Sequence, residues 1–513
     1  MKSHLLSSVA FCGAMAGIPQ TLFASCSNEI SEQVENEKVK PNIILITTDQ
    51  QSYNTISALA RLNRESSFFS TPNIDRIVKS GTAFNLTYCS NPVSVPSRFS
   101  LYTGLYGGQF SIRENLCRGA KAEEVRPVLA ENGMGHVFAS AGYETVYAGK
   151  VHLPYAGLNS DSKFAAPESY GFQQYLTKDE RAGLGKESAE FIRSRKPGDK
   201  PFLYVANFLN PHDICLEGST NVSEEIKGSE KKPEIVATVK MMRERAAAIP
   251  EEEFYGKIAP QLPYNFEVTD GYPDTKCSKK RFLDLPEKYW RKYRWTYAEL
   301  VKLVDEHIGD VLDALDANPE IKKNTIVVFT SDHGEMQGAH RSMTKSLPFE
   351  ECQRVPFVFA GKGIPEGKVI NDVAVNNGVD LLPTICELAG IDCPEVDGVS
   401  LAKCLKKGDR PQRDHIYIES ETFVTVIKDG FKYTYFDGDG GREMLINLEE
   451  DYGEMKNVAS AYPAKMVELK NIAMGYERKI PAAKATKNAK KNKQGIDKNK
   501  KKNKNKYRSF QKV

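Results

Sequence analysis

The chain has 513 residues, of which 40% are hydrophobic and 27% are charged. This length allows a large buried core and excludes a small single-core module, so we expect an enzyme-sized globular protein with more than one domain. The net charge of +3 is unevenly distributed. Residues 479–513 hold thirteen Lys and one Arg against one Asp, which gives 14 − 1 = +13 and leaves 3 − 13 = −10 for the rest.

The N-terminal segment predicts an export signal over residues 1–26. Lys2 precedes an apolar stretch of small residues that is too interrupted by Gly and Pro to be a good membrane span. The sequence from Leu22 to Cys26 resembles a bacterial lipoprotein cleavage site. We therefore expect an exported protein, periplasmic or held at the outer membrane only by a lipid on Cys26, with residues 27–40 as a polar tether. Ordinary signal cleavage and release is the alternative.

The basic C-terminal segment 479–513 alternates Lys and Asn and has few apolar residues, so it predicts a disordered tail. A polyanionic glycan or a charged cell surface is one partner for such a tail, and a solvated solubility tail is the other interpretation. Nucleic acid is not an expected partner of an exported protein. The ten cysteines have no paired spacing that predicts disulfides, and we expect most to be buried.

Apolar runs and helical patterns alternate through the first 410 residues, which is typical of an α/β sheet buried on both faces. The predicted strands are 41–48, 144–148, 202–208, 325–330 and 355–360, and the predicted helices are 72–80, 129–141, 188–194, 288–317 and 378–389. We expect a large mixed, mostly parallel sheet sandwiched by helices, forming a catalytic domain over 41–410.

The pattern changes near residue 411 to shorter β-like segments followed by a helix. The segments are 416–418, 422–427 and 431–436, and the helix is 463–477. They predict a smaller C-terminal α+β subdomain over 411–478.

Polar residues follow four of the predicted strands, where ligands bind in open α/β sheets. Asp49, Gln50, Asp332 and His333 offer oxygen and nitrogen ligands that could hold a divalent cation. Cations and proton-transfer groups stand at other strand ends or downstream, and suit an anionic substrate: Lys150, His152, His212 and Lys345.

Each of these residues also has a structural interpretation when taken alone. An Asp after a strand often caps a turn or helix, Lys345 could be a surface charge, and Ser94 could cap a helix that begins near Pro96. The ordered set of strand-end residues favours function over coincidence.

The segment Ser94-Val95-Pro96-Ser97-Arg98, followed by Leu101-Tyr102-Thr103-Gly104, resembles the maturation signature of type I sulfatases, in which Cys or Ser becomes formylglycine. Three further segments are similar to elements of this family, which belongs to the alkaline phosphatase superfamily. They are Gly149-Lys150-Val151-His152-Leu153, Ser331-Asp332-His333-Gly334 with Gly338, His340 and Lys345, and Glu443-Met444-Leu445-Ile446-Asn447-Leu448. The match runs from about Pro41 to the C-terminal helix and implies an alkaline phosphatase-like fold.

The resemblance implies a role for each matched residue. Hydrated formylglycine from Ser94 would attack sulfur and would also bind the metal with Asp49, Gln50, Asp332 and His333. Arg98 would stabilise the gem-diol, and Lys150 with Lys345 would hold the sulfate oxygens. His212 would protonate the leaving alcohol, and His152 would deprotonate the second hydroxyl to release sulfate. A serine precursor implies a Ser-type formylglycine-generating maturase as a partner.

Two positions depart from the commonest pattern of the family. Gln50 stands where many members have a second Asp, and His333 stands where Asn is common. This combination is more similar to choline sulfatases and phosphonate monoester hydrolases. Ca²⁺ is the expected metal. Because Gln50 and His333 lower the charge and hardness of the ligand set, Mn²⁺ is the alternative.

The sequence thus favours a sulfatase that acts on sulfated carbohydrates such as glycosaminoglycan or other polysaccharide fragments. A phosphonate or phosphate monoester hydrolase of the same superfamily is the second hypothesis, and a non-catalytic lipoprotein that binds sulfated glycans is the third. We expect substrate specificity to lie in the segments 215–284 and 437–442.

Overall fold

The computed structural model describes residues 39–63, 68–154, 164–217, 233–269, 285–437 and 441–479. The predicted export signal, most of the polar tether and the basic tail after Lys479 lie outside the described residues. Among the helices that are described, none combines the length and the apolar composition that a bilayer crossing requires.

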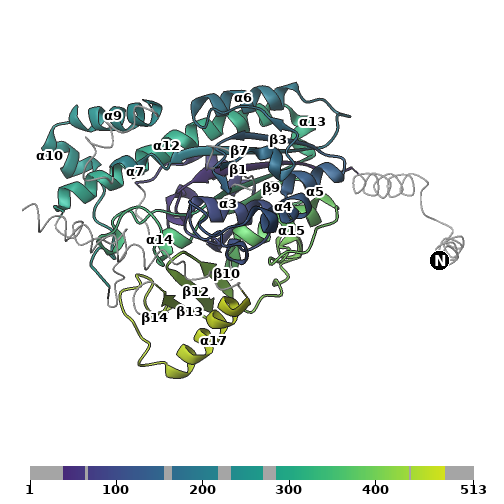
Figure 1. The fold of residues 1–513 in the computed structure, drawn as a ribbon. Helices are drawn as coiled ribbons and strands as arrows, with labels where there is room; N and C mark the ends of the chain where they lie inside the picture. The colour runs from purple at the N-terminus through teal and green to yellow at the C-terminus, as the bar shows by residue number, and fades with distance from the viewer. Residues whose placement is uncertain are drawn as a thin grey trace, which may run out of the picture. The chain divides into compact units, whose positions relative to one another are not determined.

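A mixed, mostly parallel sheet of eight strands forms the centre of the fold (Figure 1). Only β9 runs antiparallel to its two neighbours, β8 and β2. In sheet order the strands are β10 (Lys368–Asn376), β2 (Gly81–Tyr88), β9 (Phe357–Gly361), β8 (Thr325–Ser331), β1 (Asn42–Asp49), β7 (Phe202–Pro211), β3 (Glu144–Gly149) and β6 (Gln174–Tyr175). The predicted sheet class is confirmed.

Helices cover both faces of this sheet, and their apolar sides explain why β1 is buried throughout and apolar from Ile43 to Ile46. Ile44 and Ile46 of β1 join the core under one helix layer, whereas Ile43 and Leu45 point to the other. One layer holds α2 (Pro72–Lys79), α6 (Ala182–Ser194), α12 (Glu287–Asp316) and α13 (Pro319–Lys323); the other holds α3 (Ser94–Thr103), α4 (Ala122–Asn132), α5 (Met134–Ser140), α15 (Asn377–Ala389) and α16 (Ala402–Lys407).

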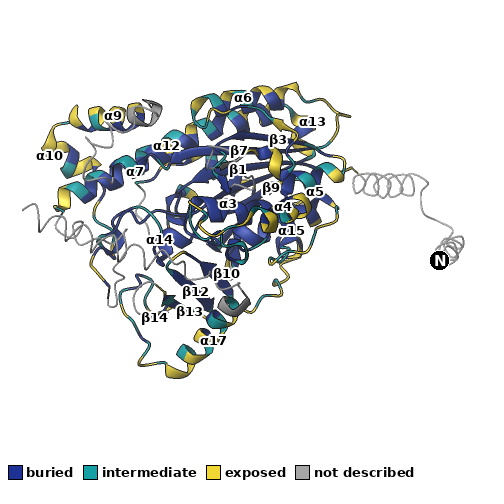
Figure 2. Ribbon diagram, viewed as in Figure 1, coloured by how far each residue is buried: buried dark blue, intermediate teal, exposed yellow. Residues whose placement is uncertain are grey.

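Figure 2 shows this arrangement as burial: the central strands and α3 are buried, while the outward sides of α6 and α13 are exposed. Every residue of α3 is buried, which is unusual for a helix and follows from its place between the sheet and α15. Four further helices lie outside these two layers: α7 (Ile214–Glu217), α9 (Pro233–Ala247), α10 (Glu251–Glu253) and α14 (Glu350–Gln353).

A second, antiparallel sheet follows in the C-terminal part of the chain, as predicted. Its strands are β11 (Ile416–Glu419), β12 (Phe423–Lys428), β13 (Phe431–Phe436) and β14 (Arg442–Asn447), in that order. The helix α17 (Pro463–Lys479) buries Leu469 and Ala473 against Val424, Tyr433 and Leu445 of this sheet. The fourth strand was not predicted, although its residues had been matched to a family segment.

One predicted helix is wrong: the pattern over 129–141 is two helices, α4 and α5. They are separated at Gly133, whose backbone is extended at φ −57° and ψ 120°. An added Cβ at Gly133 would lie only 2.4 Å from the carbonyl oxygen of Leu129 and 2.9 Å from that of Tyr170, so the close packing of the backbone after α4 requires glycine here.

Candidate functional site

Two carboxylates stand side by side because they end neighbouring parallel strands. Asp49 is the last residue of β1 and Asp332 directly follows β8, and both are fully buried. Arg98 of α3 lies between them: its Nη2 is 3.1 Å from Asp49 Oδ2 and its Nε is 3.0 Å from Asp332 Oδ2. A buried guanidinium thus links one helix to the ends of two strands.

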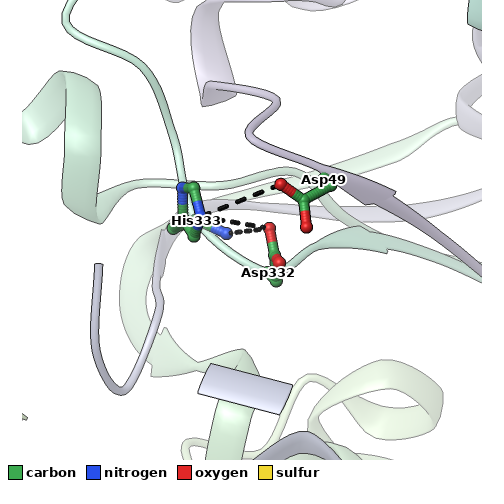
Figure 3. Close-up of side chains that lie close together, drawn as sticks. All are labelled: Asp49, Asp332 and His333. Carbon is green, nitrogen blue, oxygen red and sulfur yellow. Dashed lines mark hydrogen bonds and ion pairs between the residues drawn. The ribbon is translucent and has the colours of Figure 1, made fainter. Parts of the chain in front are cut away.

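His333 completes a group of three possible metal ligands with the two aspartates (Figure 3). One ligand atom from each residue lies within 4.8 Å of the others, and His333 Nε2 is 4.0 Å from Asp49 Oδ1 and 3.7 Å from Asp332 Oδ1. His333 Nδ1 lies 3.0 Å from the carbonyl oxygen of Gly334, an acceptor, which assigns the proton to Nδ1 and leaves Nε2 as an acceptor or metal ligand.

The donor set fits a divalent cation. Asp49 Oδ1 is buried and has no hydrogen-bond partner, which is costly for a carboxylate oxygen without a cation nearby. Burial and the Asp49 charge raise the pKa of Asp332 to about 7. A cation held by Asp49, Asp332 and His333 would pair the free Asp49 oxygen and would reduce the repulsion that Asp332 experiences from Asp49.

Gln50 presents its side-chain oxygen to the same region in a fixed orientation. Its Nε2 donates to Glu335 Oε2 at 2.5 Å, and its Oε1 accepts from Lys345 Nζ at 2.7 Å. An ionised carboxylate only accepts and an ammonium only donates, so these two partners allow one orientation of the amide. Gln50 also has φ 70°, an uncommon conformation for a residue with a side chain.

Ser94 is the first residue of α3 and is fully buried. Its Oγ lies 3.0 Å from His333 Nε2, beside the three candidate ligands. Val93 occupies the N-cap position and the helix has no side-chain cap, so the capping role considered for Ser94 is wrong. The helix N-terminus instead places its positive end at this hydroxyl.

The remaining predicted residues lie around this buried group. Lys150 follows β3 and its Nζ binds Asp49 Oδ2 at 2.5 Å. His212 follows β7, and His152 follows Lys150 with φ 31°. Lys345, His212 and His152 are partly exposed, whereas Asp49, Ser94, Arg98 and Asp332 are not. The site is therefore open to solvent on the side of Lys345 and the two histidines.

Burial and the nearby lysines keep both histidines neutral. Burial together with Lys150 lowers the pKa of His152 to about 2, and burial with Lys150 and Lys345 lowers the pKa of His212 well below its usual value. Burial opposes ionisation of Asp49, but Lys150, His212 and Lys345 hold its pKa well below the usual range. A bound anion would offset the two lysines and raise the pKa of each histidine.

The sequence did not identify two buried residues that position the others. Asn207 of β7 accepts from Arg98 Nη1 at 3.0 Å and from the Tyr102 hydroxyl at 2.6 Å through Oδ1. Glu335 accepts from Gln50, from the Tyr293 hydroxyl at 2.7 Å and from the Thr344 amide at 2.7 Å. Two features of the sequence could have identified them. Asn207 is a polar residue inside an apolar strand, and Glu335 stands two residues after the candidate ligand His333.

Comparison with known proteins identifies the family. The sulfatase family profile matches residues 41–391. A Delta 4,5-hexuronate-2-O-sulfatase of Bacteroides thetaiotaomicron is 30% identical over 448 residues, which cover 82% of this chain and 85% of that protein. The solved structure of a 2-O GAG sulfatase superposes with a TM-score of 0.64 at 27% identity, covering 86% of this chain and 93% of the other.

A phosphonate monoester hydrolase of Agrobacterium radiobacter shares the fold, with a TM-score of 0.63 at 19% identity, covering 86% of this chain and 96% of the other. The chain belongs to the sulfatase family, and the predicted family membership is confirmed.

The contacts of Glu335 predict a loss of metal affinity in the Glu335→Gln variant. The new NH₂ group must face either the Gln50 amide or the Tyr293 and Thr344 donors, so Gln50 loses its fixed orientation. We expect affinity for Ca²⁺ or Mn²⁺ to fall about 10- to 100-fold in a calorimetric titration, as for other residues that orient metal ligands. Glu320→Gln, at an exposed position of α13, is the control. Unchanged affinity in Glu335→Gln would contradict this positioning role.

Proposed function

We propose that the protein hydrolyses sulfate esters of carbohydrates and that formylglycine made from Ser94 carries out the reaction. The observation that supports this most directly is the place of Ser94: its Oγ is 3.0 Å from His333 Nε2, at the N-terminus of α3 and beside two buried aspartates. The sulfatase relatives named above act on hexuronate and glycosaminoglycan sulfates by their names, which supports a sulfated glycan as the substrate class.

The charge balance of the site suits an anion. The site contains three cationic side chains, Arg98, Lys150 and Lys345. It also contains three carboxylates, Asp49, Asp332 and Glu335, so the net charge is zero when all six groups are ionised. A divalent cation, Ca²⁺ or alternatively Mn²⁺, would add two positive charges and polarise a sulfate oxygen. Asp49, Gln50, Asp332 and His333 would hold it, together with the residue at position 94.

Each side chain then has a task that its position allows. Lys150 and Lys345 bind Asp49 and Gln50 in the ligand-free protein and would exchange part of these contacts for sulfate oxygens. Arg98 would keep the two aspartates ionised and stabilise the hydrated side chain at position 94. His152 is neutral and could accept the proton that must leave this hydrate before sulfate is released.

His212 would protonate the leaving alcohol, and the bound substrate would make this possible. Without substrate, burial and the two lysines keep the imidazole neutral. An anionic sulfate next to Lys150 and Lys345 would offset their charge and allow His212 to carry a proton.

Modification of Ser94 is the first prediction. Co-expression with a Ser-type maturase should yield active protein whose peptide around Ser94 has lost two hydrogens, because oxidation of the serine hydroxyl forms an aldehyde. Protein made without the maturase, and the Ser94→Ala variant, should have background activity. Mass spectrometry of the purified protein checks this result. A fully active enzyme with unmodified Ser94 would rule out the proposed mechanism.

The role of His212 predicts a dependence on the leaving group. In His212→Gln we expect kcat for a sugar sulfate to fall about 10²- to 10⁴-fold, because an alkoxide is a poor leaving group without a proton donor. An aryl sulfate with a good phenolate leaving group should lose far less.

The control for this experiment is His136→Gln, in α5 and outside the site. Equal losses on both substrates would show that His212 acts on something other than the leaving group.

A further inference from the structure

A second buried cluster of possible metal ligands lies outside the candidate active site. It contains His340, Glu351 and Glu454, each with one ligand atom within 4.8 Å of the others. His340 belongs to the short turn Ala339–Arg341, Glu351 to α14, and Glu454 to the loop after β14. All three are nine-tenths buried or more. The cluster thus joins loops of the large sheet to the C-terminal sheet, and α14 is drawn next to that sheet in Figure 1.

The ion pairs around this cluster leave one carboxylate uncompensated. Lys432 of β13 contacts Glu350 at 3.1 Å and Glu454 at 2.8 Å, and Arg354 contacts Glu350 at 3.3 Å. Three carboxylates therefore face two cations, which leaves one net negative charge. Among the described residues Glu351 forms no ion pair, and its only side-chain hydrogen bond comes from the neutral Asn265 amide at 2.8 Å.

Atoms that could bind a ligand here have no hydrogen-bond partner. Glu351 Oε2 and His340 Nδ1 are both buried and unpaired, and so is Asn265 Oδ1. His340 Nε2 lies 3.4 Å from Asn265 Nδ2, and the ring stacks on Phe349 at 3.8 Å. Buried polar atoms are rarely left unsatisfied, so an unpaired carboxylate oxygen and an unpaired imidazole nitrogen within one cluster indicate a missing partner.

His340 cannot itself supply the missing positive charge. Burial and the nearby Lys432 ammonium lower the pKa of His340 to about 3, so the ring is neutral and has a lone pair for a ligand. Burial raises the pKa of Glu351, and burial also raises that of Glu454 to about 8. Either a cation or a shared proton would relieve the uncompensated charge.

We propose that His340, Glu351 and Glu454 form a second, structural site for a divalent cation, of the Zn²⁺ or Mn²⁺ type rather than Ca²⁺. One imidazole nitrogen with carboxylate oxygens suits these borderline ions better than Ca²⁺, which prefers six or more oxygen ligands. A cation would satisfy the unpaired oxygen, the imidazole nitrogen and the uncompensated charge together. A proton shared between Glu351 and His340 would satisfy the same two atoms, so the metal content of the protein decides between the two.

The site has a consequence for the active site through the loop that connects its ligands. Lys345 lies between His340 and Glu351 in the sequence, and its neighbours Thr344 and Ser346 have φ of 67° and 71°. A cation bound by both ends of this loop would stabilise these uncommon conformations and thereby the position of Lys345 beside Gln50.

The test is the metal content of purified protein that has been incubated with Zn²⁺ or Mn²⁺ and then freed of excess metal. We expect about two equivalents in the unaltered chain and about one in Asp332→Asn, which disables the candidate active-site group but leaves the second cluster intact. Glu351→Gln, which keeps size and removes the charge, should also retain about one. The double variant should retain none.

Two results would overturn the proposal. Asp332→Asn protein without metal would show that the second cluster holds a proton, and Glu351→Gln protein with two equivalents would show that the second ion is bound elsewhere. Should Glu351→Gln not fold, His340→Gln gives the same comparison, and the result with Asp332→Asn decides by itself. A shift of the melting temperature of Asp332→Asn with added Zn²⁺, absent in the double variant, is the second readout.

Discussion

The guanidinium of Arg98 between Asp49 and Asp332 is the interaction on which the site depends. Two fully buried carboxylates at neighbouring strand ends would repel each other, and removing one partner of a buried ion pair typically costs about 3–5 kcal/mol. Arg98 and Ser94 are four residues apart in α3, so they share one face of the helix. The ion pairs that hold Arg98 therefore also hold Ser94 beside the candidate metal ligands.

The strand ends that carry the site were readable from the sequence because fully buried parallel strands are continuous apolar runs. β1, β3, β7 and β8 were all predicted, and they are neighbours in the sheet. The strand β2, which leads into α3, was missed because Asn85 and Thr87 interrupt its apolar pattern. The position of Ser94 at the site thus rested on a resemblance to a family signature rather than on the predicted sheet.

Contacts between residues far apart in the sequence could not be predicted from the sequence. Gln50 was identified as a candidate ligand, but the carboxylate that fixes its amide comes from Glu335, which is 285 residues away. The same holds for the cluster of His340, Glu351 and Glu454, whose members come from three separate elements. Predictions for the export signal, the lipid on Cys26 and the basic tail concern residues outside the described ranges and stay predictions.

The fold by itself does not separate sulfate from phosphonate esters, because a phosphonate monoester hydrolase shares it. Selectivity between sulfate and phosphonate esters must come from the side chains that surround the bound ester. Lys150, Lys345, His152 and His212 approach from the partly exposed side, and an ion with fewer negative charges needs less compensation from them. A sulfate monoester and a phosphonate monoester each carry one negative charge, and a phosphate monoester carries up to two. Charge compensation can therefore separate sulfate from phosphate esters, whereas discrimination against a phosphonate ester needs contacts that recognise the carbon substituent on phosphorus.

Values of kcat/KM for matched sulfate, phosphate and phosphonate esters with one leaving group, followed by defined sulfated saccharides, distinguish a carbohydrate sulfatase from a phosphonate hydrolase. We expect the highest kcat/KM for sulfate esters, with at least one sulfated saccharide as a substrate. A clear preference for the phosphonate ester would contradict this expectation.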